Sequence, residues 1–134
     1  MKPLEILLVE DNPADVGLTE EALVDTGLRH RLTVARDGEE AIALLKQLYS
    51  SDQTARPELV LLDLNMPKKN GHDVLREIEQ DPLLNDIPVI LLTVSTNQDE
   101  ILSALRIKMN YYLNKPVDPK TLRPLLSAID DLWR

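Results

Sequence analysis

Short apolar runs alternate with amphipathic segments along this chain, and this alternation restricts the possible folds more than any other feature. The strand-like runs cover residues 4–9, 32–35, 58–62, 87–92 and 111–114, and the second is the weakest. Apolar residues recur at helical spacing between and after them: Leu18, Ala22 and Leu23; Ala41, Leu44, Leu45 and Leu48; Val74, Leu75 and Ile78; Ile101, Leu102 and Leu105; Leu122, Leu125, Leu126, Ile129 and Leu132. Because repeated βα units require parallel strands with right-handed crossovers, the pattern predicts a doubly wound α/β fold with five strands and five helices.

Two segments interrupt this regular pattern. Residues 49–57 form a long polar connection, which we interpret as a solvated loop. Pro124 lies inside the last periodic segment, where a proline removes an intrahelical hydrogen bond. The pair Asp118-Pro119 has the form of a helix start, but the position of Pro124 leads us to expect that the helix begins near Thr121.

Composition excludes several functions. The net charge of −8 and the pI of about 4.7 repel nucleic acid phosphates and anionic membrane surfaces, so we expect neither as a partner. The absence of cysteine excludes disulfides and thiolate metal sites. No apolar run approaches the roughly 18 residues that span a bilayer, and no signal-peptide region precedes the first run. We therefore expect a cytoplasmic protein.

Reactive polar residues follow four of the strand-like runs. These residues are Glu10 and Asp11, Asp63, Thr93, and Lys115. In open parallel sheets, ligands bind beyond the carboxyl ends of the strands, so the four ends predict one site. If the first and third strands are neighbours, Glu10, Asp11 and Asp63 converge, and their repulsion needs a compensating charge. All the available ligands are oxygens, which favours Mg²⁺ over zinc.

Such a site suits phosphoryl transfer. Asp63 can attack a phosphoryl group, while Lys115 supplies a positive charge and Thr93 a hydroxyl donor. Each residue alone has an ordinary structural explanation: a turn or cap for the aspartate, a strand position for the threonine and a surface charge for the lysine. These separate explanations do not account for the whole set, because each residue would have to lie at the same sheet edge by chance.

The ordered motifs resemble the receiver domain of two-component response regulators over essentially the whole chain. The parts that carry the resemblance are Glu10-Asp11, the acceptor segment 63–67 with Gly71, Thr93 thirty residues after Asp63, and Lys115-Pro116 fifty-two residues after it. The segment 9–15 and the long connection 49–57 are similar to stand-alone receivers served by bacterial and cyanobacterial phytochrome histidine kinases.

The resemblance implies a flavodoxin-like sheet of order 2-1-3-4-5 and a phosphoacceptor role for Asp63. It also implies that Asp11, Asp63 and the main-chain carbonyl of Asn65 ligate Mg²⁺, with Glu10 reaching the metal through water. Glu10 departs from the more frequent aspartate, and its longer side chain disfavours direct metal contact.

Further residues would bind the phosphoryl group and transmit its presence. The resemblance implies that Lys115 pairs with the phosphoryl group and precedes a cis bond to Pro116, and that Thr93 moves toward the phosphate. Tyr112 would swing inward behind Thr93, although simple packing at a strand end also explains this aromatic residue. Phosphorylation would thereby change the surface around the fourth helix and fifth strand. Val94 replaces a residue that is usually very small, so we expect restricted access to Asp63 and slow hydrolysis.

The chain ends at Arg134, just after the last periodic segment, so we expect a single receiver domain over residues 1–134 with no output domain. We expect signalling rather than enzymatic activity, through a sensor histidine kinase and in some pathways a histidine phosphotransfer protein. An apolar patch would favour a homodimer, although core packing explains its members equally well: Ile107, Met109, Tyr111 and Trp133.

Two alternatives stay open. A phosphohydrolase of the haloacid-dehalogenase type also uses a strand-end aspartate, Mg²⁺ and a lysine, but it normally carries a second acid where this chain has Asn65. A pseudo-receiver would bind partners without ever being phosphorylated. This alternative is disfavoured by the presence of the four site residues Asp11, Asp63, Thr93 and Lys115.

Overall fold

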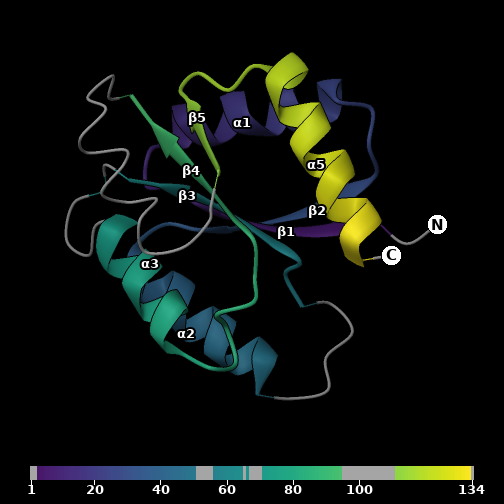
Figure 1. Cartoon of the computed structure of the whole chain (residues 1–134). Helices are drawn as coiled ribbons and strands as arrows, with labels where there is room; N and C mark the ends of the chain where they lie inside the picture. Colours follow the sequence, from purple (N-terminus) through teal and green to yellow (C-terminus); the bar gives the residue numbers. More distant parts are fainter. Residues whose placement is uncertain (1–2, 51–55, 65, 67–70, 95–110, 134) are drawn as a thin grey trace.

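The computed structural model describes residues 3–50, 56–64, 66, 71–94 and 111–133. Strands and helices alternate through these ranges (Figure 1). The strands are β1 Leu4–Val9, β2 His30–Ala35, β3 Leu59–Asp63, β4 Val89–Thr93 and β5 Tyr111–Asn114. The helices are α1 Pro13–Asp25, α2 Gly38–Tyr49, α3 Gly71–Gln80 and α5 Pro119–Trp133.

All five strands are parallel and form one sheet in the order β2-β1-β3-β4-β5. This order confirms the predicted doubly wound, flavodoxin-like fold. The described ranges hold four of the five predicted helices, because the periodic segment of Ile101, Leu102 and Leu105 lies outside them. In the same ranges, no helix combines the length and the apolar character that crossing a bilayer requires.

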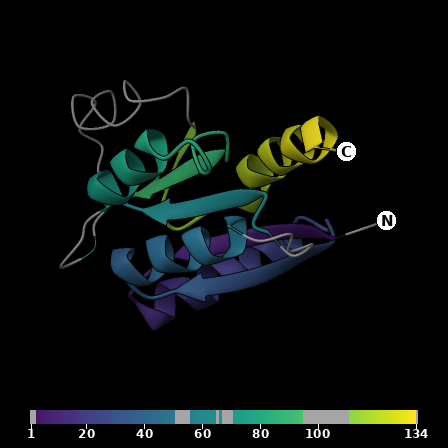
Figure 2. The same ribbon diagram turned by 90° about the horizontal axis from the view of Figure 1, so that it is seen from below.

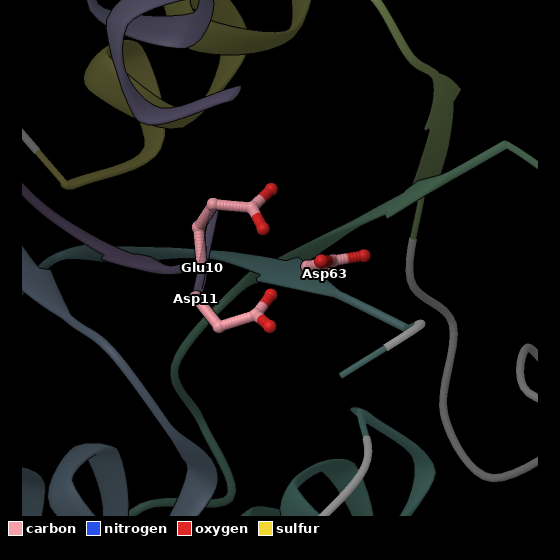
Figure 3. A group of neighbouring side chains, drawn as sticks. All are labelled: Glu10, Asp11 and Asp63. Carbon is pink, nitrogen blue, oxygen red and sulfur yellow. The ribbon is translucent and has the colours of Figure 1, made fainter. Parts of the chain in front are cut away.

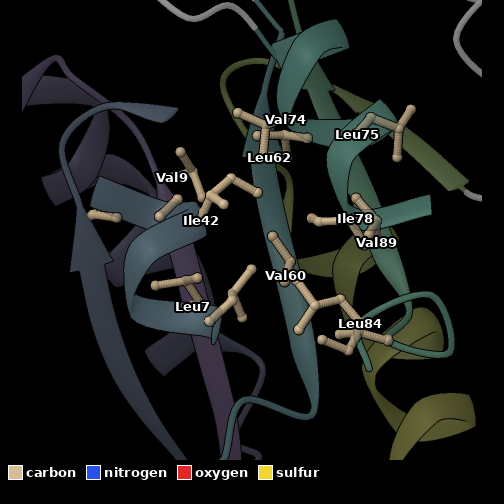
Figure 4. Packing of buried hydrophobic residues seen from close by; sticks show 14 of the residues in the cluster. Leu7, Val9, Ile42, Val60, Leu62, Val74, Leu75, Ile78, Leu84 and Val89 are labelled. Atoms are coloured by element: carbon tan, nitrogen blue, oxygen red, sulfur yellow. The ribbon is translucent and has the colours of Figure 1, made fainter. Parts of the chain in front are cut away.

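Helices cover both faces of the sheet, with α1 and α5 on one side and α2 and α3 on the other (Figures 1 and 2). Alternate residues of the central strands point into the two layers. Leu7 and Val60 pack toward α2 and α3, whereas Leu8 and Leu61 belong to the core beneath α1 and α5 (Figure 4 shows the first core). A strand buried on both faces is mostly apolar, which explains the long apolar runs in β1 and β3; their two charged residues are Glu5 and Asp63.

The last helix begins earlier than expected. It starts at Pro119, where the Asp118 side chain accepts a hydrogen bond of 2.9 Å from the Lys120 amide. Pro124 lies inside the helix and cannot donate to the Lys120 carbonyl. Both residues are exposed, so water can bind that carbonyl, and the proline is tolerated. The expectation of a start near Thr121 was therefore wrong.

Candidate functional site

Three carboxylates meet at the carboxyl ends of β1 and β3. Glu10 and Asp11 follow β1, and Asp63 is the last residue of β3, the strand directly paired with β1 (Figure 3). One oxygen from each side chain lies within 4.8 Å of the other two. Glu10 and Asp63 are buried, and Asp11 is half-buried. We call Glu10, Asp11 and Asp63 the acidic cluster.

Lys115 brings a positive charge to this cluster from the end of β5. Its Nζ lies 2.6 Å from Glu10 Oε1 and 3.2 Å from Asp63 Oδ2, and its side chain is 10% exposed. The Lys115 amide donates to the Thr93 carbonyl at 2.9 Å, which aligns the end of β5 with the end of β4. The peptide bond from Lys115 to Pro116 is cis.

The charges of the site alter its proton affinities. Burial, followed by a hydrogen bond with Asp63, raises the pKa of Glu10 to about 7, and Lys115 only partly opposes this rise. Burial alone would lower the pKa of Lys115, but nearby carboxylates, with Glu10 foremost, raise it above its ordinary value. Lys115 is therefore a permanent cation at neutral pH.

The acidic cluster has the chemistry of a site for a hard divalent cation. Its three carboxylates carry more negative charge than the single Lys115 ammonium neutralises. Glu10 Oε1 is buried and lies in ionic contact with Lys115, but no donor in the described residues is aligned to make a hydrogen bond with it. Converging carboxylate oxygens with surplus charge fit Mg²⁺ or a similar ion.

The other predicted residues lie around this centre or outside the description. Thr93 is buried at the end of β4, while the next residue, Val94, is 66% exposed. Tyr112 is 42% exposed and lines a pocket of about 440 Å³ between β5 and the start of α5. Asn65 is not among the described residues, so its predicted metal contact stays a prediction.

The predicted dimer patch also stays a prediction. Ile107 and Met109 fall outside the described ranges, and so do the side chains of Tyr111 and Trp133.

Gly71 sets the approach of α3 to the acidic cluster. A Cβ atom at this position would lie 2.5 Å from the Asp63 carbonyl oxygen and 2.5 Å from the Leu64 Cα. The Gly71 amide also donates to the Leu64 carbonyl at 3.3 Å. The helix can therefore begin against the end of β3 only because residue 71 has no side chain.

One contact of the site was missed from the sequence. Asp15 Oδ2 lies 3.0 Å from Lys115 Nζ. Asp15 lies in the first turn of α1, where Asn12 caps the helix and Pro13 is its first residue. An acidic side chain in that turn is commonly explained by the helix dipole. The position of Asp15 shortly after Glu10 and Asp11 in the sequence was the one signal that could have suggested a role in the site.

Comparisons with known proteins show to which family this chain belongs. A family model described as the response regulator receiver domain matches residues 6–127. Response regulator Rcp1 of Synechocystis sp. is 43% identical over 131 residues, which cover 98% of this chain and 89% of Rcp1. The structure of the Mn²⁺-bound form of Rcp1 matches with a TM-score of 0.74 and covers 98% of this chain and 94% of that one.

Two further solved structures share the fold over the same coverage, 98% of this chain and 94% of theirs. The phosphorylated cyanobacterial phytochrome response regulator RcpA is 41% identical, with a TM-score of 0.77. The bacteriophytochrome response regulator AtBRR is 36% identical, with a TM-score of 0.79. The family model and the 43% identity with Rcp1 show that the chain belongs to the response regulator receiver domain family.

Proposed function

We propose that Asp63 of this receiver accepts a phosphoryl group from the phosphohistidine of a sensor histidine kinase. The observation that supports the proposal most strongly is the convergence of Asp63 with two further carboxylates and with Lys115 at one sheet edge. A carboxylate that is 1% exposed has few reasons to occupy such a place unless its charge is used.

The acidic cluster would hold Mg²⁺ during transfer. Asp11 and Asp63 are the proposed direct ligands, with the main-chain carbonyl of Asn65, and Glu10 would act through a water molecule. The Mn²⁺-bound form of Rcp1 supports a divalent ion, and the oxygen donors of the cluster support Mg²⁺ in this chain. When bound, the ion would neutralise charge on the phosphoryl oxygens.

The chain's own residues would perform the remaining work. An Asp63 carboxylate oxygen forms the new O–P bond as the P–N bond to the kinase imidazole breaks. Lys115 lies 3.2 Å from Asp63 Oδ2, so its ammonium can stabilise charge on the transferred group. Thr93, at the end of the neighbouring strand, would then donate a hydrogen bond from its hydroxyl group to a phosphoryl oxygen.

The proposed output is a change of surface. Tyr112 is exposed in this structure and would turn inward once Thr93 has moved toward the phosphate. Val94 would limit the access of water to the acyl phosphate and prolong that state.

We propose that the chain acts as a single receiver domain in the cytoplasm, where ATP-dependent kinases operate, and that it signals through a partner.

RcpA and AtBRR support a phytochrome kinase as the phosphodonor, since both are described as phytochrome response regulators. A histidine phosphotransfer protein and a second copy of the chain are further proposed partners.

Incubation with a phosphorylated histidine kinase tests the proposal. We expect label to move to the wild-type chain when Mg²⁺ is present and not when it is chelated. The Asp63→Asn variant should accept none, whereas Asp25→Asn, which removes an exposed acid at the end of α1, should accept label normally. Absence of transfer from every kinase tried would support the pseudo-receiver, and turnover of free phosphoesters would support the phosphohydrolase.

A further inference from the structure

Lys115 has a third carboxylate partner that the proposed chemistry does not use. Its Nζ contacts Glu10 at 2.6 Å, Asp15 at 3.0 Å and Asp63 at 3.2 Å. Glu10 and Asp63 follow or end strands of the sheet, whereas Asp15 belongs to the first turn of α1. The contact joins residues 100 positions apart and ties the start of α1 to the end of β5.

We propose that Asp15 competes with the phosphoryl group for Lys115, holding the ammonium in the unphosphorylated protein and losing it when Asp63 is phosphorylated. This proposal rests on the proposed function, because it needs a phosphoryl group at Asp63.

Phosphorylation of Asp63 changes the acceptors that surround Lys115. A lysine ammonium has three N–H groups, and three carboxylates lie within ion-pair distance of this one. Phosphoryl oxygens are strong acceptors and carry a larger negative charge than one carboxylate. Phosphorylation also converts the Asp63 carboxylate into the acyl phosphate, so the ammonium is drawn toward the phosphoryl oxygens and one of its two other contacts, with Glu10 or with Asp15, weakens.

Burial identifies the contact that is lost. The Glu10 side chain is 0% exposed, so water cannot replace Lys115 there and the unpaired charge would be costly. The Asp15 side chain is 35% exposed, so water can solvate its carboxylate after the ammonium leaves. Asp15 also keeps a favourable position at the positive end of the α1 dipole. Release from Asp15 is therefore the least costly way for the ammonium to move toward the phosphoryl group.

The exchange would make the start of α1 sensitive to the state of Asp63. Before phosphorylation, Lys115 links the first turn of α1 to β5. After phosphorylation, the link is gone and a solvated carboxylate remains on the α1 surface, next to Asn12 and the exposed Ala14. A partner that contacts this turn could distinguish the two states directly.

Beryllofluoride with saturating Mg²⁺, an analogue of the acyl phosphate, measures the competition. Asp15→Asn should bind it about two- to fivefold more tightly than wild type, because a partly exposed ion pair of up to about 1 kcal/mol no longer has to be broken. Glu20→Gln removes one charge from the exposed face of the same helix and should leave the affinity unchanged. Equal or weaker binding by Asp15→Asn would overturn the proposal.

A metal-free measurement tests the contact itself. The ¹⁵N signal of the Lys115 ammonium should be visible by NMR in wild type, where carboxylates slow the exchange of its protons with water, and should broaden in Asp15→Asn but not in Glu20→Gln. An unchanged signal would show that Asp15 does not hold the ammonium. If wild type binds no beryllofluoride at all, the proposed function fails; if wild type and Asp15→Asn bind it equally, only the competition fails.

Discussion

Lys115 Nζ lies 2.6 Å from Glu10 Oε1, so the end of β5 neutralises the end of β1 across the two intervening strands. The pair is almost completely excluded from solvent, because the Glu10 side chain is 0% exposed and that of Lys115 is 10% exposed. Buried ion pairs of this kind add little stability compared with apolar residues, yet breaking one by removing a single partner is costly. The site therefore contributes to the integrity of the sheet edge as well as to chemistry.

Replacing Lys115 by methionine should destabilise the metal-free protein by about 3 kcal/mol at pH 8, because Glu10 and Asp63 lose their buried counter-charge. Urea denaturation measures this loss, and millimolar Mg²⁺ should recover part of it. Lys46→Met, at an exposed position in the last turn of α2, should change stability by less than about 0.5 kcal/mol. Equal stability of the two variants without metal would show that removing Lys115 from the pair with Glu10 does not destabilise the protein.

Replacing Gly71 by alanine should cost about 2–3 kcal/mol, because the new Cβ would lie 2.5 Å from main-chain atoms of Asp63 and Leu64. The strain falls on the peptide that carries the proposed phosphoacceptor, so Mg²⁺ affinity should fall as well. Denaturation and metal titration on one sample measure both effects.

Gly17→Ala is the matched control, since nothing lies within 4 Å of a Cβ at that position in α1. It should stabilise the protein by about 0.5–1 kcal/mol through helix propensity. Equal effects of the two substitutions would refute the close approach of α3 to β3.

The buried central strands were easier to predict from the sequence than the edge strand β2. Every residue of β1 and β3 is buried, and all of them except Glu5 and Asp63 are apolar, which makes these strands easy to recognise. Strand β2 is at the sheet edge and alternates between exposed and half-buried side chains, so its first two residues, His30 and Arg31, were not predicted. They pair with β1 through main-chain hydrogen bonds, which no side-chain pattern reports.

The site was predictable to the extent that the topology decides it. Parallel strands bring Glu10, Asp63 and Lys115 to one edge whatever lies between them in the sequence. The contact of Asp15 with Lys115 depends instead on how α1 lies over the sheet, and no local spacing encodes that position.

Replacing Val94 by alanine should shorten the half-life of phosphorylated Asp63 by about two- to tenfold, a change in activation free energy of at most about 1.4 kcal/mol. Val94 directly follows the buried Thr93, and its branched side chain stands at the surface of that strand end, 66% exposed. A smaller residue should admit water more easily. Loss of label over time measures the rate, and Val24→Ala, 67% exposed on α1, is the control. A longer or unchanged half-life would argue against a gating role.

The stability of the metal-free protein should depend on pH through Glu10. Its pKa is raised from 4.5 to about 7 in the folded protein, first by burial and then by Asp63. Below pH 4.5 both the folded and the unfolded chain hold the proton, and Glu10 carries no penalty. Between pH 4.5 and 7 the unfolded chain releases the proton while the folded chain keeps it, so the free energy of unfolding falls, by a total on the order of 3 kcal/mol.

Glu10→Gln cannot titrate, so the stability of wild type relative to this variant should decline across that interval and stay level above it. Glu21→Gln, at an exposed position on α1, should follow the wild-type curve. Mg²⁺ needs the ionised carboxylate, so its addition at pH 8 should offset the loss in wild type and have a smaller effect in Glu10→Gln. Parallel urea-denaturation curves for wild type and Glu10→Gln from pH 4.5 to 8 would show that Glu10 does not titrate in this range.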